Sequence, residues 1–120
     1  MTTYDGPGDP RLHALLTEIG VLHDQKQEDY GTEGDPFANV RASEQWGIPA
    51  WVGAMIRLND KIQRLKTLAQ RGHLANEDPH DSFKDIAVYA LIADILYTEW
   101  EDLQRKSQDV LPVSTSEATP

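Results

Sequence analysis

The chain has 120 residues, a length that predicts one domain with a core large enough to fold without covalent cross-links. It contains no cysteine, which excludes a disulfide framework, thiolate chemistry and a zinc site of the cysteine type. Its formal net charge of −9 argues against direct binding of a polyanion, whereas one local basic patch would suffice for a small phosphorylated ligand.

No apolar run approaches the ~18 residues that a membrane span requires, so no membrane partner is expected. The N-terminal segment MTTYDGPGDP lacks the basic and apolar regions of a signal peptide. These two features predict a soluble, cytoplasmic protein.

Signals for helix starts and ends follow one another from the N-terminus. Asp9 and Pro10 predict a helix start, with the aspartate as N-cap and the proline at the first helical position. The next apolar residues recur at helical spacing: Leu12, Leu15, Leu16, Ile19 and Leu22. We therefore expect residues 1–9 to be flexible and a first helix to reach Tyr30, where Gly31 ends it.

Two more aspartate–proline pairs, at residues 35–36 and 78–79, predict further helix starts. The first introduces a short helix over FANVRASEQW, and the second a long helix that ends near residue 106. Between them, a long helix is expected from Pro49 to about Gln70. Its large apolar residues alternate at spacings of four and three, as in a packing seam: Trp51, Met55, Leu58, Ile62, Leu65 and Ala69.

No segment alternates as a strand does, so the fold class is all-α. We predict an antiparallel bundle of three long helices and one short helix, forming a single domain over residues 10–106. Residues 107–120 have the composition of a disordered tail.

The third of these helices carries a local excess of positive charge. Residues 57–71 contain five basic residues and one acid. Arg57, Lys61 and Arg64 share one face with Asp60, and this face is expected to lie opposite the seam. It is either a solvated surface with an Asp60–Arg64 ion pair or a phosphate-binding stripe, since guanidinium groups bind phosphate oxygens bidentately.

Carboxylates interrupt the apolar surface of the last helix. Glu77, Asp81 and Asp85 follow one another at i, i+4 and i+8, and we call them the carboxylate line. Three carboxylates in line repel each other unless a cation lies between them, and oxygen ligands favour Mg²⁺ or Mn²⁺. Alternatively, Asp85 forms a structural ion pair with the basic helix, and Asp81 only favours the helix dipole. Under the same alternative, Glu77 lies outside the helix, since it precedes Pro79.

The first helix ends in KQEDYG, residues 26–31. Lys26 and Tyr30 continue its apolar stripe, where leucine would ordinarily lie, and Asp29 lies at the edge of the stripe. We therefore expect Lys26, Asp29 and Tyr30 to face the carboxylate line across a pocket.

Four motifs in order resemble a family of small bacteriophage proteins known as the nucleotide modification associated domain, type 1. They are K-x-x-D-Y-G (residues 26–31), PFANVRASEQWGIP (36–49), R-x-x-D-K-x-x-R-L (57–65) and E-x-x-x-D-S-x-x-D-I-A-x-Y-A (77–90). The resemblance covers roughly residues 12 to 98. It implies a role near phage nucleotide metabolism or DNA base modification, in the host cytoplasm.

The chain also resembles, more weakly, the all-α nucleoside triphosphate pyrophosphohydrolases of the MazG and dimeric dUTPase group. That resemblance implies a helical, Mg²⁺-dependent homo-oligomer, a dimer or higher. The group uses E-x-x-E and E-x-x-D pairs, whereas this chain has Ser82-x-x-Asp85, and Asp60 has no acid one turn away. This departure would place a missing ligand elsewhere, such as on Glu28 or Asp29.

Three functions remain open at this point: Mg²⁺-dependent hydrolysis of a nucleoside triphosphate, nucleotide binding or sequestration without chemistry, and a structural role with the seam as a dimer interface. Hydrolysis would use three sets of residues. They are the catalytic Asp60, Asp81 and Asp85; the metal ligands Glu77, Asp81 and Asp85; and the substrate-binding Lys26, Asp29, Tyr30, Arg57, Lys61 and Arg64.

Overall fold

The computed structural model describes residues 4–30 and 35–110, except for the side chains of residues 29, 30, 109 and 110. These residues form helices, which confirms the predicted all-α class: α1 (Pro10–Tyr30), α2 (Ala38–Arg41), a 3-10 helix η1 (Ala42–Trp46), α3 (Ala50–Arg71) and α4 (Pro79–Val110). The expected short helix is thus divided into α2 and η1, and α4 continues four residues beyond its expected end. In the described part of the chain, no helix is long and apolar enough to cross a membrane.

Local side-chain chemistry explains where the helices begin and end. In each aspartate–proline pair, the carboxylate accepts a hydrogen bond from the backbone amide two residues later, at 2.8 Å for Asp9 and 3.0 Å for Asp35 and Asp78. Gly47 and Gly72 end η1 and α3 with φ angles of 76° and 84°, in the left-handed region that favours glycine.

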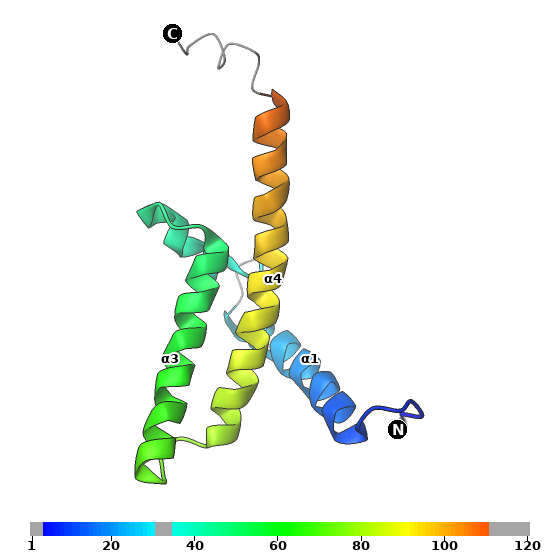
Figure 1. Ribbon diagram of the computed structural model, residues 1–120, viewed down its shortest axis with the longest axis vertical. Coiled ribbons are helices and arrows are strands. Elements are labelled where there is room, and N and C mark those ends of the chain that lie inside the picture. The colour runs from blue at the N-terminus through cyan, green and yellow to red at the C-terminus, as the bar shows by residue number, and fades with distance from the viewer. Residues whose placement is uncertain (1–3, 31–34, 111–120) are drawn as a thin grey trace.

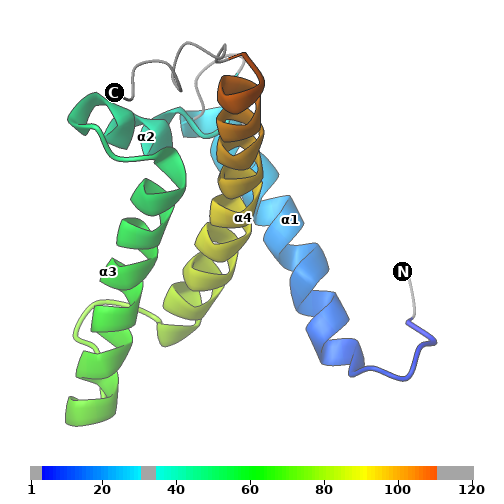
Figure 2. The same cartoon turned by 45° about the horizontal axis from the view of Figure 1, so that its top comes forward.

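The long helices do not close into a bundle within one chain. α3 and α4 lie side by side as an antiparallel pair, whereas α1 crosses the other side of α4 and diverges from it towards the N-terminus (Figures 1 and 2). The radius of gyration is 19.4 Å. A globular chain of this length would have a radius of about 14 Å. The molecule is therefore open, with α4 as its central helix.

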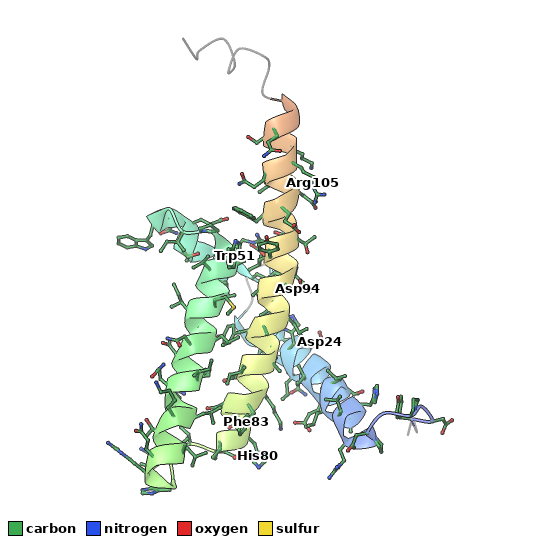
Figure 3. The ribbon with its side chains drawn as sticks, viewed as in Figure 1. Asp24, Trp51, His80, Phe83, Asp94 and Arg105 are labelled. Carbon is green, nitrogen blue, oxygen red and sulfur yellow. The ribbon has the colours of Figure 1, made fainter. Side chains whose placement is uncertain are left out.

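The core lies where α2, α3 and α4 meet. Its buried residues are Val40, Ala50, Ala54, Ile92, Ala93 and Leu96. Beside it, Trp51 lies in the angle between α3 and α4 and packs edge-on against Tyr97, with ring centroids 5.3 Å apart (Figure 3). α4 is thus central, as expected, but it is buried on one face only, since Phe83 and Leu91 are more than half exposed.

The orientation of α3 differs from the expected one. Met55 and Ile62 of the seam are 41% and 38% exposed, and Leu58 is the seam residue that is buried. Small residues at positions 50, 53 and 54 allow α3 to approach its neighbours closely, and they turn the helix about its axis. Consequently Lys61, one turn after Leu58, faces α4 instead of solvent. The prediction that Lys61 lies opposite the packed face is wrong.

Arg41 fastens α2 to the central helix. Its guanidinium nitrogens lie 2.8 Å from an oxygen of Asp35 and 2.9 Å from an oxygen of Glu99. The hydrogen bond to Glu99 raises the pKa of Arg41, although partial burial opposes this effect. The two ion pairs of Arg41 join the chain before α2 to the middle of α4, and they hold the short helices over the core.

Gly53 is the point of closest approach between α3 and the segment before it. A Cβ atom at this position would lie 2.6 Å from Ser43 Oγ and 2.9 Å from the Val40 carbonyl oxygen. Gly53→Ala is expected to lower the free energy of unfolding by about 1–2 kcal/mol, because the clash outweighs the better helix propensity of alanine. Urea denaturation followed by circular dichroism measures the change. The exposed Gln70→Ala on the same helix is the control, and equal stability of the two variants would contradict the close contact.

Candidate functional site

One carboxylate joins all three long helices. Asp85 of α4 has one oxygen 3.0 Å from the Nζ of Lys61 on α3 and the other 3.5 Å from the Nζ of Lys26 on α1. The side chains of Asp85 and Lys61 are only 23% and 21% exposed, whereas that of Lys26 is 61% exposed. We call these three residues the ion cluster. They hold α1, α3 and α4 together at a point where the apolar core has ended.

Each member of the ion cluster continues the inward-facing stripe of its own helix. Lys26 lies two turns after the buried Ile19, and Lys61 lies one turn after the buried Leu58. Asp85 lies one turn before Val88, which packs against the core. Lys26 therefore faces Asp85, as expected. Asp85 forms an ion pair with Lys61 of the basic helix, which was the alternative to a metal site.

A polar pocket of about 460 Å³ opens beside the ion cluster, towards the start of α4. Its cations come from all three long helices: Lys26, Lys61, Arg64 and Lys84. Its carboxylates are Glu77, Asp78, Asp81 and Asp85. The pocket is therefore charged but balanced, and both of the predicted charge patterns contribute to it.

A second pocket of about 260 Å³ lies on the other side of the ion cluster. It shares Lys26, Lys61, Lys84 and Asp85 with the polar pocket, so these residues form the wall between the two. Its remaining lining includes three rings, those of His23, Phe37 and Tyr89, and we call it the aromatic pocket. The lining of this pocket contains three lysines and one carboxylate, Asp85, and the partner of Lys84, Glu18, lies outside the lining. The lining therefore carries an excess of positive charge in a strongly acidic chain.

Lys84 was missed by the sequence reasoning. It forms an ion pair with Glu18 of α1, and the hydrogen bond to that carboxylate raises the pKa of the lysine. Its place beside Asp85 in the sequence was a possible signal, but the partner on α1 is visible only in the fold.

The three residues of the carboxylate line all line the polar pocket, but their side chains do not come together at one point. Glu77 pairs with Arg64 at 3.0 Å and Asp85 pairs with two lysines, while Asp81 is exposed at the rim of the polar pocket. Glu77 precedes the first residue of α4, so helical spacing does not bring it over Asp81. Within the described ranges, no three histidine, aspartate or glutamate side chains are close enough to hold a metal ion. The expected Mg²⁺ ligands therefore do not converge here.

Of the remaining predicted site residues, some line the pockets and others do not. Arg64 lines the polar pocket, but Arg57 and Asp60 are exposed on α3 and line neither pocket. The side chains of Asp29 and Tyr30, and the whole of Gly31, lie outside the described part of the chain. The site as seen consists of Lys26, Lys61, Arg64 and Lys84 with their acidic partners.

A scan against protein-family models, a search of curated proteins and a search of solved structures each found no match to this chain. The two family resemblances therefore remain hypotheses drawn from the sequence motifs.

Proposed function

We propose that the protein binds a phosphorylated small molecule, a nucleotide if the motif resemblance holds, in the two joined pockets. The observation that carries the proposal is that three lysines, from three different helices, line one pocket in a chain of net charge −9. Two of them, Lys26 and Lys61, pair with the single carboxylate of the lining, Asp85. Such a concentration of cations attracts phosphate groups, because charge-assisted hydrogen bonds to phosphate oxygens are among the strongest in proteins.

The two pockets suit the two halves of a nucleotide. We call the residues shared by the two pockets, Lys26, Lys61, Lys84 and Asp85, the lysine wall. The lysine wall would neutralise the phosphates, and Asp85 holds Lys26 and Lys61 in place before the ligand arrives. On the aromatic side, the rings of His23 and Phe37 lie 6.2 Å apart and offer flat apolar surface for a base. Together the pockets fall within the ~300–1,000 Å³ of typical small-molecule sites.

Ligand-dependent melting tests the binding proposal. We expect nucleoside mono-, di- and triphosphates to raise the melting temperature by several degrees at about a hundred times the dissociation constant, and the parent nucleosides to have less effect. Tripolyphosphate alone separates phosphate binding from base binding. If none of these compounds shifts the melting temperature, the lysines serve only to hold the helices together and the proposal fails.

Hydrolysis of a bound nucleoside triphosphate is the second candidate. It is favoured by the carboxylates that line the polar pocket next to the cations, and by the weaker resemblance to pyrophosphohydrolases. Because the carboxylates do not converge, we assign no step to a metal. The check is pyrophosphate release from a panel of deoxynucleotides with Mg²⁺ or Mn²⁺. If nucleotides raise the melting temperature but no pyrophosphate is released, the protein binds or sequesters nucleotides, or has an accessory role in base modification, without hydrolysing them.

We also propose that the antiparallel bundle expected from the sequence closes only when chains associate as a homo-oligomer. The three long helices alternate in direction along the chain, as such a bundle requires (Figure 1). However, Leu12, Leu15 and Leu16 of the apolar stripe of α1 are about half exposed. From the family resemblance we also propose that the protein is encoded by a phage and acts in the host cytoplasm.

A further inference from the structure

We infer that a second copy of this chain docks in an apolar groove between α1 and α4, with the closest approach of the two copies at Gly20. The inference concerns a different face from the lysine wall and does not depend on the identity of the ligand. It specifies which surface makes the homo-oligomer.

The groove has a volume of about 230 Å³ and an almost wholly apolar lining. α1 contributes Leu16 and Gly20, α4 contributes Leu91 and Ile95, and Phe37 also lines the groove. The side chains of Leu16, Leu91 and Ile95 are each about half exposed. Monomeric soluble proteins rarely leave so continuous an apolar surface uncovered, so a partner is expected here.

Gly20 indicates how closely that partner approaches. It lies in the middle of α1, where glycine is less favourable than alanine. A Cβ atom at Gly20 would meet no other atom within 4 Å, whereas one at Gly53 would clash with Ser43. The chain itself therefore gives no packing reason for glycine at position 20. Close contact with the backbone of another helix supplies one.

The chain carries both halves of a self-complementary contact. Besides the groove, the N-terminal half of α1, which diverges from α4 (Figure 2), carries Leu12 and Leu15, which are about half exposed, and Leu16, which also lines the groove. In an isologous dimer, each copy places this arm against the groove of the other. A groove and an arm on the same chain therefore favour a second copy over an unrelated partner.

The size of the face is at the lower end of the range for a stable dimer interface. At about 1.5 Å per residue, the 21 residues of α1 extend for about 31 Å. With α4 beside it, the face measures roughly 600 Å² in projection, near the ~800 Å² per partner of a standard interface. The groove shares Ile19, His23 and Phe37 with the aromatic pocket, so the second copy would also cover the back of that pocket.

Sedimentation equilibrium of the full chain tests the inference. We expect a dimer, and we expect Leu91→Glu to raise its dissociation constant by about a hundredfold, because a charge would be buried in the groove. Ile56→Glu is the control, since Ile56 is equally exposed but lies on α3, outside the groove. A natural chain that stays monomeric overturns the inference, and so does a dimer that Ile56→Glu weakens and Leu91→Glu does not.

Gly20→Ala provides a second test with a variant that favours the helical state. If a partner helix packs at Gly20, the added methyl group should raise the dissociation constant of the dimer by about tenfold or more without loss of helical circular dichroism. If no partner packs there, the dimer is unchanged and the melting temperature rises, which contradicts the inference. Neither outcome depends on nucleotide binding, so the two proposals fail separately.

Discussion

Lys61→Ala is expected to weaken nucleotide binding by about ten- to a hundredfold. Lys61 lies in the wall between the two pockets and is the least exposed lysine of the ion cluster. A hydrogen bond to a charged group contributes about 1.5–3 kcal/mol, and each 1.4 kcal/mol corresponds to about a tenfold change in affinity. Its loss would also free Asp85 to repel the incoming phosphates.

Isothermal titration calorimetry with the tightest nucleotide of the melting panel measures this change. Lys66→Ala and Arg57→Ala are the controls, since both side chains are exposed on the same helix and line neither pocket. Both control variants should have a free energy of unfolding within about 0.5 kcal/mol of that of the natural chain. If Arg57→Ala weakens binding as much as Lys61→Ala, the ligand lies on the outer face of α3 instead of in the pockets.

Asp85→Asn is expected to lower stability and to increase affinity for phosphate. Exposed ion pairs contribute about 0–1 kcal/mol, and breaking a buried one costs about 3–5 kcal/mol. Asp85 lies between these limits, because it and Lys61 are mostly buried whereas Lys26 is largely exposed, so we expect a loss of about 1–2 kcal/mol. Removal of one negative charge from the lysine wall should tighten phosphate binding by about three- to tenfold.

Denaturation and calorimetry on the same variant separate the two roles of Asp85. Asp94→Asn is the matched control, because Asp94 is exposed on the same helix and has no ion-pair partner among the described residues (Figure 3). If Asp85→Asn instead abolishes binding or pyrophosphate release while stability is unchanged, Asp85 acts directly on the ligand, as the hydrolase hypothesis requires. Rising salt should reduce the stability difference, since it screens the exposed Lys26.

Features set by neighbouring residues could be predicted from the sequence. The aspartate–proline pairs at residues 9–10 and 78–79 mark the starts of α1 and α4, because the carboxylate and the amide it binds are only two residues apart. At residues 35–36 the same hydrogen bond forms, but α2 begins only at Ala38. The position of Lys26 on the side of α1 that faces Asp85 followed from the spacing of the leucines before it. Both predictions depend on one helix at a time, and periodicity describes a single helix well.

Features that depend on contacts between helices were predicted less well. The alternating pattern places Met55 and Ile62 on the packed face of α3, but both are exposed, and the α3–α4 contact is made where small residues, such as Ala50 and Ala54, allow close approach. The carboxylate line assumed helical geometry before Pro79, where α4 begins. The divergence of α1 was not predictable, since the apolar stripe of an amphipathic helix does not state which surface covers it.

The separation of α1 from the α3–α4 pair also determines how the molecule opens. α3 and α4 are neighbours in the sequence and share most of the contacts between helices, so they form one cooperative unit with short loop closure. α1 is held to α4 by a short crossing, the Lys84–Glu18 pair and the Lys26–Asp85 pair. In a single chain, amide hydrogens of α1 should exchange by a local opening that leaves the α3–α4 pair protected. One of the three lysines of the wall can therefore leave the site, and a ligand can enter, without unfolding of the rest.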